Sequence, residues 1–250
     1  MTRIPIAVQL YSVRHDAARD LPATLDAIAK MGYEGVEFAG YYDHSAEQLK
    51  ALLDERGLKC AGTHTKLDTL RGEELQQTID FHKTLDNRFL IVPGLPGEYY
   101  ESRAKWLEFC REISEISERA AKQDMVVGYH NHSREFQEID GQNLMEIFLR
   151  ETPQNVVAQF DLGNAMHGGG DCLPLMEKYP GRAGTIHLKE YKEGDPQAFV
   201  GDGDVNWQRV FELCERDGKT AWYIVEYESD ALTPLECIDR CLQNLKKMGK

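Results

Sequence analysis

Short apolar runs alternate with longer segments of helical spacing from one end of the chain to the other. The runs are rich in Val, Ile and Gly, which fits strands buried on both faces. Between them, apolar residues recur three and four positions apart, as Leu21, Leu25 and Ile28 do before Gly32, and this spacing is typical of helices. We expect eight strands, at residues 4–11, 35–38, 58–64, 88–92, 125–130, 156–161, 183–188 and 222–226.

Eight strands alternating with eight helices predict an α/β protein whose parallel sheet closes into a (β/α)8 barrel. The 250 residues suffice for one such barrel, and no linker or low-complexity segment divides the chain. We therefore predict a single domain over residues 1–250. A doubly wound open sheet is the main alternative. Its nucleotide-binding form is weakened because no GxGxxG turn follows the first strand.

Charge and cysteine content narrow the classes of partner. The net charge of -13 and the isoelectric point near 5.1 make binding to nucleic acid or to anionic membranes a poor expectation. No signal peptide is visible, and no apolar run approaches the roughly 20 residues of a membrane span. The six cysteines form no CxxC pair, so we interpret them as reduced packing residues. These features predict a cytoplasmic protein without nucleic-acid or membrane partners.

Four of the expected strands end in a residue that can bind a metal ion. They are His130 in VVGYHNH, Asp161 in VVAQFDLGN, His187 in AGTIHLKE and Glu226 in WYIVEYE. In a parallel barrel all these ends meet at one mouth. Taken singly, each has a plainer explanation: a helix cap for Asp161, a hydrogen-bonded core residue for His187, a structural ion pair for Glu226, and a metal-free network for His130 with His132. Together they predict one shared site whose nitrogen and oxygen ligands favour Mn²⁺, Mg²⁺, Co²⁺ or Zn²⁺.

Other polar residues would lie at the same mouth. Gln9, Glu37 and His64 end strands in the first half of the chain and could contact substrate hydroxyls, although each could equally be a turn former or a structural hydrogen bonder. His132 shares a strand face with His130 because side chains alternate along a strand. Lys189 would add positive charge near a developing oxyanion, or else be a solvated surface lysine.

The motifs as a set resemble the xylose isomerase-like TIM barrel superfamily, in the sugar phosphate isomerase/epimerase group. The resemblance covers nearly the whole chain through AVQLYSVR, GYEGVEFAG, GTHT, YHNHSREF, QFDLGN, IHLKE, GDGDVNW and VEYE, in that order. It implies a divalent metal held at the ends of strands five to eight, commonly by Glu, Asp, His and Glu. Three of those positions correspond to Asp161, His187 and Glu226.

The fifth strand departs from this pattern. Many members have a Glu-Asn-His type of segment where this chain has His130-Asn131-His132. We place His130 in the metal position, with Glu135 as the alternative ligand. The departure removes a fifth-strand glutamate that would act as an acid or base in the epimerase relatives.

The resemblance implies sugar chemistry that begins next to a carbonyl. The metal would polarise a sugar carbonyl or hydroxyl and stabilise an enediolate, while Glu226 or His132 transfers the proton. We expect a metal-dependent sugar isomerase or epimerase with a small sugar or keto-sugar as substrate. The alternative is a lyase, dehydratase or hydratase acting on keto-glycosides or keto-inositols at the same metal site.

Two other classes remain open. An endonuclease IV-like DNA repair enzyme would need a richer cluster of histidines and carboxylates than this chain offers. A metal-free sugar-binding barrel would have no catalytic activity. Relatives are often dimers, so a homodimer is also left open.

Overall fold

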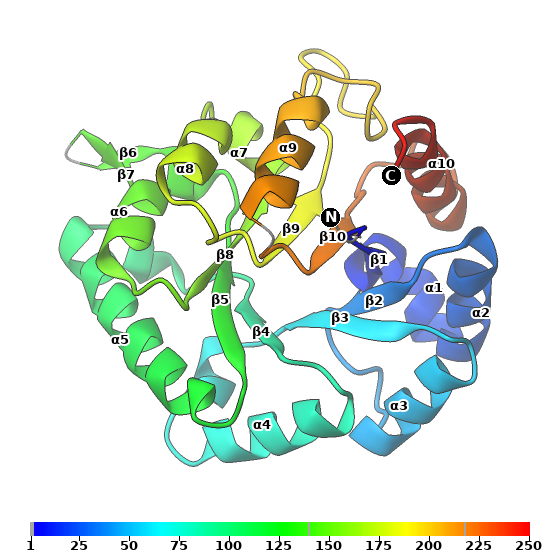
Figure 1. The fold of residues 1–250 in the computed structure, drawn as a ribbon, viewed down its shortest axis with the longest axis horizontal. Helices are drawn as coiled ribbons and strands as arrows, with labels where there is room; N and C mark the ends of the chain where they lie inside the picture. Colours follow the sequence, from blue (N-terminus) through cyan, green and yellow to red (C-terminus); the bar gives the residue numbers. More distant parts are fainter. Residues whose placement is uncertain (1–2, 140, 218) are drawn as a thin grey trace.

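The computed structural model describes residues 3–139, 141–217 and 219–250 and shows a closed parallel barrel. The predicted fold is therefore confirmed, although Met1, Thr2, Asp140 and Gly218 lie outside the described residues. Around the barrel the strands follow the order β1-β10-β9-β8-β5-β4-β3-β2, and the helices surround them (Figure 1). The barrel strands are β1 (Ile6–Gln9), β2 (Gly35–Phe38), β3 (Lys59–His64), β4 (Phe89–Val92), β5 (Val126–His130), β8 (Val157–Asp161), β9 (Thr185–Leu188) and β10 (Trp222–Val225).

The helical segments are more numerous than the sequence predicted. The loops that follow β1 and β8 each contain two α-helices, so the expectation of one helix per strand is wrong there. Asp20 and Pro22 explain the first case, because the Asp20 side chain caps a new helix that has proline in its first turn. The α-helices are α1 (Arg14–Arg19), α2 (Leu21–Met31), α3 (Ala46–Asp54), α4 (Glu74–Thr84), α5 (Arg103–Ala121), α6 (Leu144–Glu151), α7 (Leu162–His167), α8 (Leu173–Lys178), α9 (Trp207–Asp217) and α10 (Pro234–Lys247).

Several loops at the carboxyl ends of the strands contain short 3-10 turns. The first strand is shorter than predicted because residues 10–13 turn into such a segment. The 3-10 segments are η1 (Leu10–Val13), η2 (Leu67–Leu70), η3 (Gly97–Tyr100) and η4 (Arg134–Phe136), and a small antiparallel pair, β6 (Glu138–Ile139) and β7 (Gln142–Asn143), follows η4.

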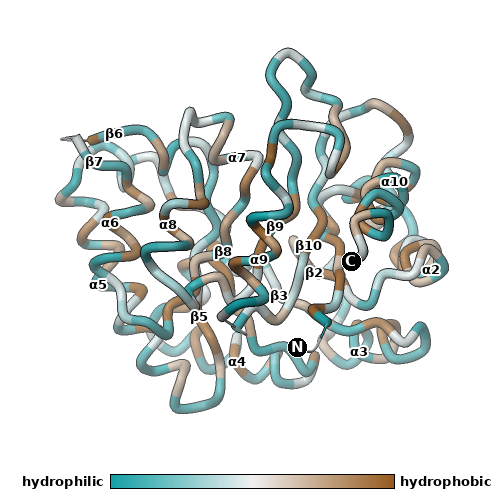
Figure 2. The backbone as a smooth tube through the Cα atoms, turned by 45° about the horizontal axis from the view of Figure 1, so that its top comes forward, coloured by the Kyte–Doolittle hydropathy of each residue, from teal (hydrophilic) through white to brown (hydrophobic). Residues whose placement is uncertain are grey.

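The main apolar core lies between the strands and the helices, which bury their apolar faces against the barrel. Figure 2 shows the contrast between the hydrophobic colours along the barrel strands and the hydrophilic colours of the exposed loops. Inside the barrel, the layers farther from the carboxyl mouth are apolar and contain small clusters such as Ala7, Ala61 and Ile224. Nearer the carboxyl mouth the interior is polar, with Gln9, Glu37 and other groups fully buried. This polar layer is the floor of the candidate site.

Two further expectations concern the whole chain. The structure buries all six cysteines, which agrees with their interpretation as packing residues. Among the helices of the described residues, none combines the length and apolar character needed to cross a bilayer. The location of the protein in the cell stays a prediction.

Candidate metal centre and active site

The structure brings together the four residues that the sequence singled out at the ends of consecutive barrel strands. His130 ends β5, Asp161 ends β8, His187 lies in β9, and Glu226 directly follows β10. One ligand atom from each lies within 4.8 Å of the others, and all four residues are buried. Asp161 and His187 are register partners in neighbouring strands, so the barrel itself fixes their proximity.

The orientation of these side chains is more informative than their proximity. His130 Nδ1, Asp161 Oδ2, His187 Nδ1 and Glu226 Oε2 are all buried atoms without a hydrogen-bond partner among the described residues. His187 Nδ1 and Glu226 Oε2 lie only 2.6 Å apart, yet no hydrogen bond of acceptable geometry joins them. Burying four such atoms without hydrogen bonds is costly. A shared cation would satisfy all four, and two imidazoles with two carboxylates suit a divalent transition metal.

Asp161 performs two tasks with its two oxygens. Oδ1 accepts a hydrogen bond of 2.7 Å from the backbone N–H of Asn164 and so caps helix α7. Oδ2 makes no hydrogen bond and lies 3.8 Å from His187 Nδ1. The helix-cap explanation and the ligand prediction are therefore compatible. Asn131 holds the same strand end in place, since its side-chain amide bonds the backbone N–H and C=O of Asp161 at 3.0 and 3.1 Å.

A buried carboxylate orients His187 from the opposite side. Glu37 Oε2 lies 2.6 Å from His187 Nε2, which leaves Nδ1 for the cluster. Gln9 Nε2 donates to Glu37 Oε2 at 2.8 Å, and Gln159 Nε2 donates to Glu37 Oε1 at 2.8 Å. Gly62 in β3 makes room for this carboxylate, because a Cβ there would lie 2.7 Å from Glu37 Oε1. Such an outer carboxylate commonly fixes the tautomer and ring orientation of a metal-binding histidine.

The electrostatic balance of the cluster fits a site for a cation. Burial raises the pKa of Asp161 to about 7. Burial also acts on Glu226, but Lys189 and His187 outweigh it and hold the pKa of that carboxyl well below its usual range. For His130, burial and the neighbouring His187 lower the pKa, which keeps the imidazole neutral and able to bind a metal.

Above the cluster, a cavity of about 680 Å³ opens at the mouth of the barrel. We call it the mouth cavity. The side chains of His64, His130, His132, Glu226 and Glu228 line it, with Tyr11, Ala39, Gly40, Tyr41, Thr65, Lys66, Thr69 and Pro93 completing its wall. Of the four cluster residues, His130 and Glu226 line the cavity, so it opens onto that side of the cluster.

His64 and His132 differ in how firmly they are held at this cavity. His64 Nε2 lies 3.0 Å from Gln159 Oε1, and Gln159 uses its amide nitrogen on Glu37 and on Thr185. His64 therefore donates through Nε2, which leaves Nδ1 as an acceptor when the ring is neutral. The His132 ring is exposed and packs edge-on to His130, with 4.9 Å between ring centroids.

Lys189 is largely buried between two carboxylates. Its Nζ lies 3.5 Å from Glu226 Oε1 and forms an ion pair with Glu228, and only 13% of its side chain is exposed. The alternative of a solvated surface lysine is wrong. It neutralises charge beside the cluster, although it does not line the mouth cavity.

Two of the sequence expectations need correction. Gln9 and Glu37 are completely buried and absent from the wall of the mouth cavity, so the structure does not bring them to a substrate. They lie one layer deeper because their side chains point into the barrel and bond each other and His187.

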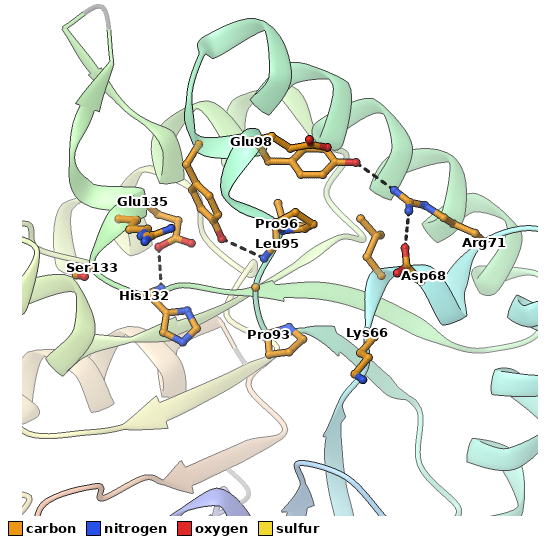
Figure 3. Close-up of a pocket in the computed structure, with 15 residues that line it drawn as sticks. Lys66, Asp68, Arg71, Pro93, Leu95, Pro96, Glu98, His132, Ser133 and Glu135 are labelled. Atoms are coloured by element: carbon orange, nitrogen blue, oxygen red, sulfur yellow. Dashed lines mark hydrogen bonds and ion pairs between the residues drawn. The ribbon is translucent and has the colours of Figure 1, made fainter.

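Glu135, the alternative fifth-strand ligand, lies outside the four-residue cluster. Its carboxylate accepts a hydrogen bond from Tyr129 Oη. It also accepts one at 2.8 Å from the backbone N–H of His132, which Figure 3 shows. The geometry therefore favours His130. Gln159 and Asn131 were missed as positioning residues. A signal existed for Gln159, because it precedes Asp161 by two residues and so shares its strand face within an apolar run.

Comparison with known proteins agrees with this fold. Residues 25–248 match the xylose isomerase-like TIM barrel family, and the chain belongs to that family. Several of the similar proteins carry the names of sugar-processing enzymes.

Individual relatives are distant but cover most of the chain. An inosose dehydratase of Clostridium perfringens is 23% identical over 267 residues, which cover 89% of this chain and 88% of the relative. A sugar phosphate isomerase/epimerase structure from Parabacteroides distasonis superposes with a TM-score of 0.85 at 23% identity, covering 98% of this chain and 94% of the other. A D-allulose 3-epimerase from Methylomonas sp., solved with D-allulose, gives a TM-score of 0.72 at 16% identity, with coverage of 99% and 98%. These structures share the fold.

Proposed function

We propose that this protein is a divalent-metal-dependent lyase that eliminates an oxygen substituent from a keto-sugar or keto-cyclitol. The observation that carries the proposal is the convergence of four buried ligand atoms that make no hydrogen bond, in a cluster of which His130 and Glu226 line the mouth cavity. His130, Asp161, His187 and Glu226 would hold the cation. When bound there, it would act as a Lewis acid on a substrate carbonyl and favour loss of the adjacent proton.

The residues around the cluster favour elimination over epimerisation. Epimerisation by the two-glutamate scheme needs a carboxylate on each face of the substrate, and the fifth-strand position is occupied by His130 instead of a glutamate. Glu226 directs Oε2 to the cluster and Oε1 to Lys189, so neither oxygen is free to act as a base. The inosose dehydratase similarity over 89% of the chain supports the same choice.

Proton transfer falls to His132 in this proposal. Its ring is exposed at the cavity beside His130, within reach of a substrate above the cluster. His132 takes the proton from the carbon next to the carbonyl, and the C–H electron pair forms the new double bond. The C–O bond on the neighbouring carbon then breaks, and His132 returns the proton to the departing oxygen. His64 Nδ1 would accept a hydrogen bond from a substrate hydroxyl.

Incubation of metal-loaded protein with a keto-inositol and with keto-sugars tests the proposal. We expect an unsaturated ketone and loss of water or of an alcohol, observed as a mass change and as ultraviolet absorption of the conjugated carbonyl. Chelator-treated protein serves as the control. Loss of neither water nor alcohol from any keto substrate would contradict the proposal.

Isomerase or epimerase activity is the second candidate, because two histidines from different strands, His64 on β3 and His132 beyond β5, line the same cavity. It predicts a product of unchanged mass that acquires solvent deuterium at the epimerised carbon. The experiment above separates the two reactions directly. Nicking of abasic duplex DNA by the purified protein would instead point to DNA repair.

A further inference from the structure

A second cavity adjoins the mouth cavity, and we infer that it binds a ring attached to the substrate through the oxygen that leaves. This inference rests on the proposed elimination and specifies its substrate as a keto-glycoside of two rings. The second cavity, which we call the loop cavity, has a volume of about 660 Å³. Its wall is made by three segments: 66–68 with Arg71, 93–96 with 98–100, and 132–135 (Figure 3).

The two cavities meet at three shared residues, Lys66, Pro93 and His132. Figure 3 shows these three at one side of the loop cavity, with Pro93 between the two longer side chains. The His132 ring is 4.9 Å from the ring of His130, so one imidazole separates the cation cluster from the loop cavity. A substrate whose reacting carbons lie above the cluster would therefore direct its next substituent past His132.

The loop cavity has the chemical character of a site for a hydroxylated or aromatic ring. Tyr99 and Tyr100 contribute partly buried aromatic surface, and the Arg134 guanidinium lies 5.5 Å from the centre of the Tyr100 ring. The Lys66 ammonium has no hydrogen bond or ion pair with any residue that the structure describes. Aromatic faces with nearby donors suit rings that carry both apolar faces and hydroxyl or ether oxygens.

The size of the two cavities supports a substrate longer than one sugar. Pockets of about 300–1,000 Å³ generally accommodate a complete drug-sized ligand. The mouth cavity alone, at about 680 Å³, is ample for a monosaccharide. The loop cavity has nearly the same volume and shares His132, the residue proposed to protonate the leaving oxygen. A one-ring substrate that loses only water would leave it unfilled.

Hydrogen bonds fix the wall of the loop cavity. Tyr100 Oη accepts from the backbone N–H of Leu95 at 3.1 Å and lies 2.8 Å from Tyr129 Oη, which donates to Glu135. Glu135 in turn holds the backbone N–H of His132. The loops after β4 and β5 are thus linked by one chain of buried and partly buried hydrogen bonds, and preformed walls of this kind are typical of binding sites.

The test compares 3-keto-glucosides that carry a methyl, a benzyl or a glucosyl group on the leaving oxygen, with a keto-inositol as a one-ring substrate. We expect kcat/KM to be at least about tenfold higher for the benzyl or glucosyl compound than for the methyl compound. The better of the two shows whether the ring is aromatic or a sugar. Equal rates for all three would overturn the inference while leaving elimination intact. Absence of reaction with every substrate, keto-inositol included, would contradict the proposed function itself.

Variants assign the preference to the loop cavity. Arg134→Ala and Lys66→Ala should each reduce the ring-over-methyl ratio several-fold, mainly through KM, while metal content stays unchanged. Arg150→Ala, which removes a half-exposed arginine paired with Glu151 outside both cavities, is the matched control. A ratio that survives in the double variant Lys66→Ala/Arg134→Ala would show that the preference arises elsewhere and would overturn the assignment.

Discussion

The Nε2 atom of His187 lies 2.6 Å from Oε2 of Glu37, and both side chains are fully buried. Burial alone would lower the pKa of His187, but Glu37 and Glu226 raise it to about 10. The His187 ring is therefore held between two carboxylates, Glu37 in the buried polar layer and Glu226 in the cluster. Because Glu37 fixes Nε2, the geometry leaves Nδ1 to face the other ligand atoms.

We predict that Glu37→Gln lowers metal affinity about 10–100-fold without removing a ligand, which is the usual effect of losing an outer carboxylate partner. Titration of chelator-treated protein with Mn²⁺ or Zn²⁺ measures the change. Glu55→Gln, an exposed carboxylate on the outside of the barrel, is the control. Equal affinities for both variants would show that Glu37 does not orient a ligand.

The convergence of the four ligands could be predicted from sequence because topology alone enforces it. Parallel strands in a barrel end at one mouth, so a polar residue that follows an apolar run is expected to lie at that mouth. The depth of a side chain within the barrel could not be predicted. Glu37 and His64 both lie at the ends of strands, yet Glu37 is buried in the floor while His64 reaches the cavity. Their depths depend on strand stagger and on the space left by Gly62.

The loop cavity also could not be predicted from the pattern of apolar and polar residues. It forms where the 3-10 segments η2, η3 and η4 come together, and no periodicity in their sequences encodes that arrangement. The shorter first strand and the extra helices have the same origin, since local caps and turns such as Asp20-Leu21-Pro22 override the simple alternation.

Asp161 allows its two roles to be separated by a pair of substitutions. Asp161→Asn retains an oxygen that can cap α7 but replaces the unpaired Oδ2, so we predict loss of metal and of turnover with little change in the apoprotein. Asp161→Ala loses both functions, and its apoprotein should be less stable than that of Asp161→Asn by about 1 kcal/mol. Elemental analysis and thermal unfolding measure these effects. Full metal content in Asp161→Asn would contradict the ligand assignment.

Removal of the metal should destabilise the native protein, because a ligand that binds only the folded state stabilises it. At a free metal concentration 100 times Kd the gain is about 2.7 kcal/mol, so chelation should lower Tm by roughly 5–10 °C. Differential scanning calorimetry with Mn²⁺, Mg²⁺, Co²⁺ and Zn²⁺ added back ranks the candidate ions. The Glu226→Ala variant should show no shift with any of them. A shift as large as that of the native protein would remove Glu226 from the site.

His132→Asn should retain the metal but slow proton transfer, because the ring lies beside the cluster and is not among its unpaired atoms. We expect kcat to fall by about 10²–10⁴, the usual contribution of a positioned acid or base. Incorporation of solvent deuterium next to the carbonyl measures the step directly. Unchanged incorporation would exclude His132 from the mechanism, and the control His15→Asn alters an exposed histidine away from the mouth cavity.

His82 lies outside the site and gives the fold a predictable sensitivity to acid. It is completely buried, Nδ1 accepts from Asn87 Nδ2 at 3.1 Å, and Nε2 lies 3.1 Å from Tyr41 Oη. Burial lowers the pKa of His82 to about 4. In the unfolded chain a histidine binds its proton near pH 6.5, so below that pH the unfolded state gains protons that the folded state does not.

The contribution of neutral His82 to the free energy of unfolding is therefore complete above about pH 6.5 and is lost as the pH falls toward 4. At pH 4 the loss amounts to about 3 kcal/mol. Urea unfolding between pH 7 and pH 4 should show this loss. In His82→Gln, which has no group that titrates there, the decline should be smaller by that amount. His15→Gln, which alters an exposed histidine, is the control. Parallel pH profiles for His82→Gln and the native protein would mean that His82 binds its proton equally well in the folded and unfolded states, which the Asn87 amide facing Nδ1 argues against.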